Sequence, residues 1–372
     1  MGIRQIEIQL IASIVAVAAS LPGNFLILRK MSMMSDAISH SILPGIVIGF
    51  FIAGSISSPI LAIGAALTGV LTVWLVEVLN KSKLINEDAS IGIVFPALFS
   101  IGVILITKFA GNVHLDTDAV LLGELAFAPF DRIIINGIDI GPKSLIMMSV
   151  ILLVNLIFIF IFYKELKIST FDPSLAESMG FKPEVMHYAL MTVVSITAVG
   201  SFEAVGSILL VALMIAIPAT SYLLTDELSK MILLSSLIGI ITAISGYWSA
   251  HLLDVSISGS MASMAGIIFF IVLFLSPKHG ILTMLKRRKN LKLEFAKMAL
   301  TIHLQNHEEE EESSINHLYD HFSWNEKFAD KVIKNSIKDS LIKIENNMIF
   351  LTEKGITFAD KSLKALRIEN FK

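Results

Sequence analysis

The chain has 372 residues, of which 54% are hydrophobic and only 16% are charged. Soluble domains carry about a quarter charged residues, so this composition excludes an ordinary soluble enzyme and indicates a membrane protein. Cysteine is absent, which excludes disulfides and thiolate zinc sites, and the formal net charge of −3 is unevenly spread along the chain. The alternating segments of about ten residues that mark a β-barrel are not found. The expected fold class is therefore an all-α polytopic membrane protein.

Apolar runs of about 20 residues, long enough to cross a hydrocarbon core, occupy the first three quarters of the chain. The run from the N-terminus continues through Leu28, so it is interpreted as a span and not as a signal peptide. The run over 185–224 is too long for one helix and favours two short spans, although a re-entrant segment and eight spans also fit. The nine expected spans are 8–28, 34–54, 58–80, 89–109, 143–163, 185–201, 203–224, 228–250 and 258–276.

The basic residues alternate with the spans. With nine spans, one side carries Arg29–Lys30, Lys81–Lys83, Lys164–Lys167, Lys230 and Lys286–Lys289, and the other carries mainly Asp116, Asp118, Glu124, Asp139 and Asp254. The positive-inside rule then places the N-terminus outside and the C-terminal tail in the cytoplasm.

The second span contains a polar pair in the stretch SDAISHSILPG. Measured from a helix start just after Lys30, Asp36 and His40 lie roughly 9 and 15 Å inward, and their spacing of four residues places both on one helix face. A carboxylate at such depth costs about 2.5–3.5 kcal/mol, and Pro44 interrupts the helix ladder behind the pair. Carboxylate and imidazole suit zinc, manganese or ferrous iron. The residues alone leave open a metal or proton pathway and a pair that only bridges packed helices.

Four stretches resemble one known family, the membrane permeases of ABC importers for zinc, manganese and iron. The family's Arg, Asp-Ala-hydrophobic-Ser-His and Leu-Pro-Gly pattern corresponds to LRKMSMMSDAISHSILPG. The other matches are ASIGIVFPALFSIGVILI, VGSILLVALMIAIPAT and SGYWSAHLLDVSISGS with LFLSPKHG, in the family's order. The resemblance covers roughly residues 10–280 and departs at Glu203, where a basic or neutral residue is expected.

The resemblance implies a permease subunit in the bacterial inner membrane. Its partners would be ABC ATPase subunits, an extracytoplasmic metal-binding protein and a second permease copy or paralogue. The metal ion would be the substrate, with no permanently bound cofactor and no enzymatic site, and Asp36 and His40 would contact the ion in transit. The alternatives are a proton- or ion-coupled secondary metal transporter, and a membrane-tethered metal sensor acting through the tail.

The chain contains no GxxxxGK[ST] phosphate loop, so ATP would act only through a partner subunit. The candidate contact is the inner loop FDPSLAESMGFKPEV, residues 171–185. Asp172 and Pro173 are typical of a helix start, and Gly180 of a helix end. The resemblance implies the same role, because the family's coupling helix has an Ala-Glu-x-x-Gly core, which corresponds here to Ala176, Glu177 and Gly180.

Several groups near the outer mouth are weaker candidates for cation attraction: His114, Asp116, Asp118, Glu124 and Glu203. They would raise the local cation concentration at the entrance. A solvated loop is the favoured interpretation for the first four, and a helix N-terminal cap for Glu203. For His251 and Asp254, at the same face, interface hydrogen bonding is favoured over metal binding.

The tail, 286–372, is polar and is expected to form a second, cytoplasmic domain after a permease domain of 1–285. Lys286–Lys289 would anchor it near anionic lipid. Helices are expected over 291–306, 313–321, 326–343 and 356–367, with MIFLTEKG forming a strand and turn. This order resembles a small α+β winged-helix domain, which some members of the permease family carry.

Two functions are considered for the tail. DNA binding is not favoured, because helix 326–343 mixes its lysines with acidic residues and contains no arginine. The pairs His303/His307 and His317/His321 have the i,i+4 spacing of a metal site, but solvated helical histidines remain the favoured interpretation.

Overall fold

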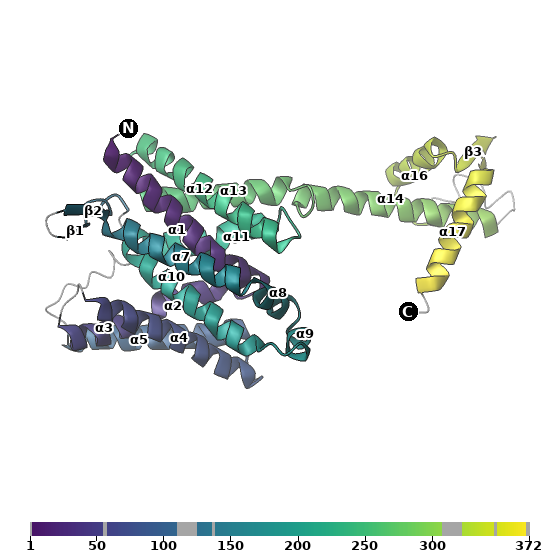
Figure 1. Ribbon diagram of the computed structural model, residues 1–372. Coiled ribbons are helices and arrows are strands. Elements are labelled where there is room, and N and C mark those ends of the chain that lie inside the picture. The colour runs from purple at the N-terminus through teal and green to yellow at the C-terminus, as the bar shows by residue number, and fades with distance from the viewer. Residues whose placement is uncertain are drawn as a thin grey trace. The chain divides into compact units, whose positions relative to one another are not determined.

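The computed structural model describes residues 2–54, 58–109, 125–135, 138–306, 322–345 and 348–369. The chain divides into two compact units, Met1–Gly280 and Ile281–Lys372 (Figure 1). The break comes before the change in composition at residue 286, because the first turn of the following helix, starting at Ile281, is still apolar.

The first unit is a bundle of helices, and the described residues contain nine helices or helix pairs long and apolar enough to cross a membrane. This confirms a mostly helical, polytopic membrane protein. The candidate spans are Ile3–Leu28, Ser32–Ala53, Ile60–Lys81, Glu87–Phe109, Lys143–Ile161, Pro183–Phe202, Ala204–Tyr222, Leu228–Leu253 and Ile257–Leu275.

Helix α1 (Ile3–Leu28) is the centre of this bundle and packs on α7 (Lys143–Ile161), α10 (Pro183–Val211) and α12 (Leu228–Leu253). Ala12, Ala16 and Ala19 are fully buried along it. Small side chains allow helix backbones in a membrane to approach closely. Two buried amides add hydrogen bonds: Asn24 Nδ2 donates to Ser235 Oγ at 2.8 Å, and Asn155 Nδ2 donates to the Ala18 carbonyl at 2.9 Å.

The second span consists of two helices, α2 (Ser32–Ser41) and α3 (Leu43–Ala53), which meet at Ile42. Pro44 lies in the first turn of α3, where its missing N–H is tolerated. Helix α3 packs closely on α4 (Pro59–Lys81), because a Cβ added at Gly45 would overlap the Gly64 carbonyl. The break at Pro44 thus ends the helix that carries Asp36 and His40.

The long apolar run after residue 183 is interrupted, as expected. Gly206 lies inside α10 with φ 75° and ψ 170°, so the helical backbone is broken there, just inside the seventh candidate span, Ala204–Tyr222. A π-helical turn, η1 (Ala212–Ala216), follows and leads into α11 (Ile217–Tyr222). A Cβ added at Gly23 of α1 would overlap the carbonyl of Met214, so this turn touches the backbone of α1.

A short antiparallel hairpin, β1 (Arg132–Ile135) and β2 (Ile138–Pro142), precedes α7 and was not expected from the sequence. Arg132 joins it to the start of α1: its Nη1 donates to Glu7 Oε1 at 3.0 Å and its Nε to Asp139 Oδ2 at 2.6 Å. These hydrogen bonds raise the pKa of Arg132, with the Glu7 bond as the larger cause.

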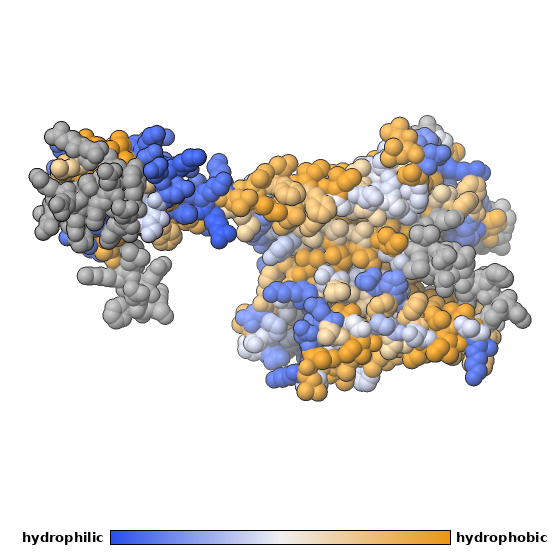
Figure 2. Space-filling model, turned by 180° about the vertical axis from the view of Figure 1, so that it is seen from behind, coloured by the Kyte–Doolittle hydropathy of each residue, from blue (hydrophilic) through white to orange (hydrophobic). Residues whose placement is uncertain are grey.

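The outward faces of α5 (Glu87–Phe109), α7, α12 and α13 (Ile257–Leu275) carry exposed apolar side chains, including Ile104, Leu153, Leu233 and Phe270. On the nine-span unit, the face shown in Figure 2 is largely hydrophobic, with hydrophilic residues gathered mainly toward its two ends. This distribution fits a surface that meets hydrocarbon at its waist and water at its ends.

The second unit contains α14 (Ile281–Asn306), α16 (Glu326–Lys338), the hairpin β3 (Ile342–Glu345) and β4 (Met348–Leu351), and α17 (Glu353–Glu369). Its core includes Leu300, Val332, Ile342 and Ile349. Helix α16 ends before the expected residue 343, because Ser340 takes a left-handed conformation and β3 begins at Ile342. The helix expected over 313–321 lies outside the described residues.

A buried lysine, Lys297, links α14 to the end of α16 inside the second unit. Its side chain is buried and pairs with Asp339 Oδ2 at 2.5 Å and with Glu294 Oε1 at 2.8 Å. Burial lowers the pKa of Lys297, but the hydrogen bonds to Asp339 and Glu294 outweigh it and raise the pKa overall. The charge of this lysine is therefore held by two carboxylates from α14 and the end of α16.

Candidate functional site

Helix α2 brings Asp36 and His40 together as their spacing predicts. His40 Nε2 lies 3.5 Å from Asp36 Oδ1. The helix packs between α4, α5 and α10, in the apolar part of the second span. Within a single chain, 50% of the Asp36 side chain and 24% of the His40 side chain remain exposed. The pair is therefore partly open and is not sealed inside the bundle.

Two phenylalanines of α5 border the imidazole of His40. The ring centroids of Phe95 and Phe99 lie 5.5 and 6.5 Å from that of His40, the second edge-on. They form an apolar wall on one side of the pair, which reduces water access and strengthens the attraction of the carboxylate for a cation. Both lie in the stretch ASIGIVFPALFSIGVILI, where nothing in the residue pattern distinguishes them from the other apolar residues of the span.

Three of the four serines of α2 point into the bundle and do not extend the open face. Ser35 Oγ donates to Met214 Sδ at 3.1 Å, Ser39 Oγ donates to the Ser35 carbonyl at 2.9 Å, and Ser41 Oγ lies 2.6 Å from Thr72 Oγ1. All three are buried. They fix the rotation of α2, so that Asp36 and His40 are presented on its remaining face.

The pair can supply one carboxylate oxygen and one imidazole nitrogen to a passing cation. These donors suit zinc and manganese among divalent ions. In the part of the chain that the structure describes, no group of three or more His, Asp or Glu side chains is arranged to hold a metal ion. Further donors to an ion at this pair would come from water, backbone carbonyls or a partner.

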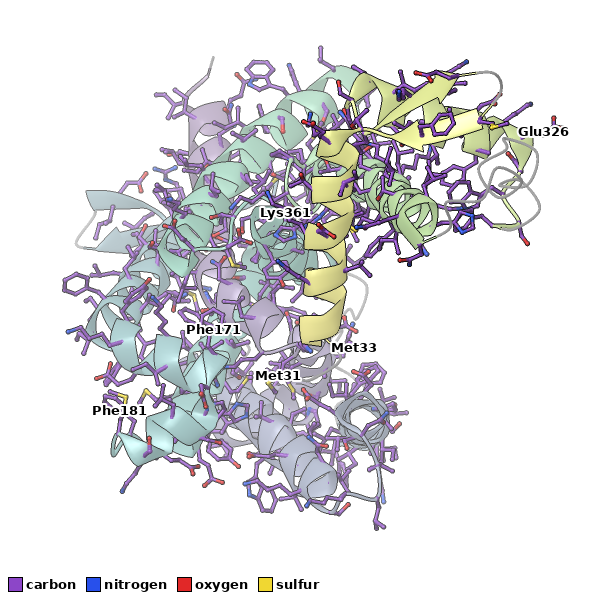
Figure 3. The ribbon with its side chains drawn as sticks, turned by 90° about the vertical axis from the view of Figure 1, so that its right-hand side faces the viewer. Met31, Met33, Phe171, Phe181, Glu326 and Lys361 are labelled. Atoms are coloured by element: carbon purple, nitrogen blue, oxygen red, sulfur yellow. The ribbon has the colours of Figure 1, made fainter. Side chains whose placement is uncertain are left out.

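The loop that was predicted to face inward forms the short helix α9 (Pro173–Ser178), as its sequence predicts. Asp172 Oδ1 accepts a hydrogen bond from the Leu175 N–H at 2.9 Å, Pro173 occupies the first turn, and Gly180 follows the helix with φ 87°. Ala176 is buried, whereas Phe171, Leu175 and Met179 are exposed. Figure 3 labels Phe171 and Phe181 on either side of this helix. The loop thus presents a firmly capped helix with an apolar surface.

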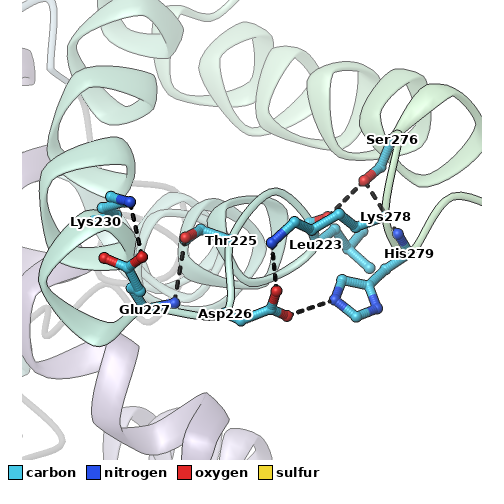
Figure 4. Close-up of polar contacts among 8 residues, drawn as sticks. All are labelled: Leu223, Thr225, Asp226, Glu227, Lys230, Ser276, Lys278 and His279. Carbon is cyan, nitrogen blue, oxygen red and sulfur yellow. Dashed lines mark hydrogen bonds and ion pairs between the residues drawn. The ribbon is translucent and has the colours of Figure 1, made fainter.

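The LFLSPKHG stretch joins the end of α13 to the loop between α11 and α12 (Figure 4). Ser276 Oγ donates to the Leu223 carbonyl, Lys278 Nζ donates to Asp226 Oδ2, and His279 Nε2 lies 2.9 Å from Asp226 Oδ1. The hydrogen bonds from Lys278 and, secondarily, from His279 lower the pKa of Asp226, and the Asp226 bond raises the pKa of Lys278. These contacts tie the end of α13 to the loop between α11 and α12, in a stretch remote in sequence from Asp36.

The weaker outer candidates are only partly described. His114, Asp116, Asp118 and Glu124 lie outside the described residues, as does the side chain of Glu203. His251 and Asp254 line a cavity of about 350 Å³ with Tyr247, Phe127 and the start of α13. His251 stacks on Tyr247, with ring centroids 6.3 Å apart.

The tail histidines cannot be assembled into a site. The favoured interpretation of a solvated histidine is wrong for His303, which is buried on α14 and meets the ring of Phe322 edge-on at 5.3 Å. His307, His317 and His321 lie outside the described residues. The proposed tail metal site therefore stays a prediction.

Nine candidate spans around a partly open carboxylate–imidazole pair define a polytopic membrane protein of the transport class. The pattern of the ABC 3 transport family matches residues 5–276, and the chain belongs to this family.

Curated relatives extend the comparison. The chain is 44% identical over 361 residues to the zinc transport system membrane protein TroD of Treponema pallidum, covering 96% of this chain and 98% of TroD. It is 45% identical over 283 residues to the manganese transport system membrane protein MntD of Bacillus subtilis, covering 76% and 96%. The similarity to TroD therefore extends into the second unit.

A solved structure shares the fold. The chain aligns with PsaBC of Streptococcus pneumoniae, determined in complex with a Fab, at a TM-score of 0.62 and 30% identity. The alignment covers 74% of this chain and 93% of that one. The family assignment expected from the motifs is thus confirmed by sequence and by fold.

Proposed function

We propose that the chain is the permease subunit of an ATP-driven importer that moves a divalent transition metal across the bacterial inner membrane. Zinc and manganese are the foremost candidates, because they are the metals named for TroD and MntD, and the donor chemistry also accommodates ferrous iron. The observation that carries the proposal is the partly exposed Asp36, paired with His40 inside an apolar span.

The exposed side of the Asp36–His40 pair must be shielded from lipid by another protein surface. A carboxylate facing hydrocarbon costs about 2.5–3.5 kcal/mol or more, and half of the Asp36 side chain is open in the single chain. A second permease copy or a paralogue would enclose this face and create a polar path between the two chains. The ion would pass Asp36 and His40 there and leave when the inner side opens.

Separate ATPase subunits would drive the cycle through α9. The capped helix and its exposed Phe171, Leu175 and Met179 support a docking contact that moves as a rigid body. An extracytoplasmic binding protein would deliver the ion. The distribution of basic residues supports an outside N-terminus and a cytoplasmic tail.

The tail is proposed to be a winged-helix-like domain, supported by the order α16, hairpin β3–β4 and α17. Helix α16 contains no arginine, and Glu326 and Asp330 interrupt its lysines, so DNA is not its expected partner. Contact with the transporter subunits or with lipid is the proposed role.

The test is metal uptake by the intact complex, measured element by element in cells. Asp36→Asn keeps the size of the side chain but removes its charge, and uptake is expected to fall at least about tenfold, since one charged ligand to a metal or ion pair is commonly worth several kcal/mol. The control is Asp131→Asn, an exposed carboxylate paired with Lys143 near the hairpin β1–β2, which should leave uptake normal. Normal zinc, manganese and iron content in the Asp36 variant would reject the proposal, and uptake that persists without ATP would favour a secondary transporter.

A further inference from the structure

We propose that Arg29 is the positioning residue that links α9, the helix assigned to the ATPase contact, to α2, the helix that carries Asp36 and His40. This inference rests on the proposed function and adds to it the route by which ATP hydrolysis reaches the metal pair. It assigns Arg29 no contact with the ion.

Arg29 follows α1 directly, and its guanidinium is held by three neutral groups. Its Nε donates to Thr170 Oγ1 at 3.1 Å and its Nη2 donates to Ser169 Oγ at 3.2 Å. Its Nη1 lies 3.4 Å from His187 Nδ1. Because a guanidinium has no acceptor, Nδ1 must be the acceptor in this last contact.

These three partners bracket α9 in the chain. Ser169 and Thr170 lie in the last turn of α8 (Tyr163–Phe171), and Asp172, the N-cap of α9, follows them. His187 lies in the first turns of α10, which begins at Pro183 after α9 ends. Arg29 therefore holds the helix before α9 and the helix after it. A displacement of α9 must either carry Arg29 with it or break these contacts.

On its other side, Arg29 is joined to α2 by a short and firmly bonded turn. Lys30 takes a left-handed conformation with φ 62°, and the Met31 N–H donates to the Leu26 carbonyl at 2.9 Å. Met31 is the N-cap residue of α2, and Asp36 comes 36 − 29 = 7 residues after Arg29. Figure 3 labels Met31 and Phe171, which adjoin the two ends of this link. Because this turn is short and hydrogen-bonded, a movement of the Arg29 guanidinium is expected to move α2 and its Asp36–His40 pair as well.

The energetics of Arg29 favour a role in coupling over a role in stability. Burial lowers the pKa of Arg29 to about 10, so the guanidinium stays charged at neutral pH in surroundings that disfavour its charge. Its hydrogen bonds go to hydroxyls and an imidazole, whereas other basic groups of this end, such as Lys81, pair with carboxylates. Because these partners are neutral, removing the guanidinium leaves no buried charge without its partner, which is the change that destabilises most.

A nearby lysine offers a matched control. Lys81 Nζ pairs with Glu77 Oε1 at 3.1 Å and with Glu184 Oε1 at 3.0 Å. It therefore also holds the first turn of α10, but it ties that turn to α4 and not to α2. Lys81→Met removes a charge and an interhelical contact at the same end of the bundle without removing any of the three Arg29 contacts.

The experiment uses the permease assembled with its ATPase subunits and binding protein in lipid vesicles, with Mn²⁺ and Zn²⁺ as probes. It measures ATP hydrolysis and ion uptake in the same sample. For Arg29→Met we expect ATP hydrolysis to continue while the number of ions moved per ATP falls about tenfold, a typical size for a coupling between two sites. The ion concentration for half-maximal uptake should not change, Arg29→Lys should fall between Met and wild type, and Lys81→Met should couple normally.

A second variant keeps the proposal testable if Arg29→Met fails to assemble. Ser169→Ala with Thr170→Val removes two of the three acceptors and leaves the arginine in place, and it should lower the ions moved per ATP in the same way. A normal ratio of ions to ATP in either variant would overturn the proposal. If Asp36→Asn transports normally, the proposed function fails; if only the Arg29 variants transport normally, this inference alone fails.

Discussion

Close backbone packing at single residues holds the centre of the bundle together. Gly23 lies against the π-helical turn η1, where a Cβ would overlap the Met214 carbonyl. Met214 also accepts the hydrogen bond from Ser35, the neighbour of Asp36. Through this contact η1 helps to position α2, the helix that carries Asp36 and His40.

Gly23→Ala should destabilise the permease by about 1–3 kcal/mol, because overpacking pushes α1 away from η1. The measurement is thermal unfolding of the purified protein in detergent. Gly92→Ala in α5 is the matched control, since nothing lies within 4 Å of a Cβ there, and alanine in place of a helical glycine should be neutral or stabilising. Equal stability of the two variants would contradict the packing described for α1.

The proximity of Asp36 and His40 could be predicted from the sequence, whereas the contacts around them could not. Asp36 and His40 could be placed together because a helix brings residues four apart onto one face. Arg29 could not be connected to its partners, which lie 140 to 158 residues away in the chain. Periodicity carries no information about contacts of that separation. For the same reason, the contact of Phe95 and Phe99 with His40 could not be predicted from the sequence.

At the scale of elements, spans and caps follow from local chemistry. The nine spans were predicted from apolar length, and the start of α9 from Asp172 and Pro173. The hairpin β1–β2 was missed because its strands have four and five residues, too few for a period to be recognised. Helix α16 was predicted too long. The chain leaves the helix through a left-handed residue at Ser340, and glycine, the usual sequence signal for such a residue, is absent from this position.

The cap of α9 can be tested at this scale. Asp172→Ala removes the acceptor for the Leu175 N–H and should cost about 1 kcal/mol of local helix stability. We expect weaker association with the ATPase subunits, measured by co-purification from membranes. Asp172→Ser preserves a capping oxygen and should restore association. Loss of association in both variants would assign the role of Asp172 to its charge and not to the cap.

At the scale of the whole molecule, the nine-span bundle, Met1–Gly280, and the tail, Ile281–Lys372, are separate structural units. MntD is similar to this chain over 283 residues that make up 96% of its own length. The contacts of Asp226 with Lys278 and His279 lie entirely within the first unit. These contacts at the end of α13 therefore do not involve the second unit.

A chain ending at Gly280 should insert normally and retain metal uptake. The measurement is cellular manganese and zinc content in a strain that carries only the shortened chain, with membrane abundance checked by immunoblot. Loss of uptake at normal abundance would show that the second unit takes part in transport. A change only in the response of uptake to metal supply would assign it a regulatory role.

The buried position of α1 has a consequence for biogenesis. In its most apolar stretch 72% of the residues are buried, against 17% in α13, and Asn24 finds its partner Ser235 only 211 residues later. At about 5–20 residues per second, the ribosome needs about 10–40 s to supply that partner. Helix α1 thus completes its packing long after it is made, and until then the Asn24 amide is satisfied within α1 by its hydrogen bond to the Ser20 carbonyl at 2.7 Å.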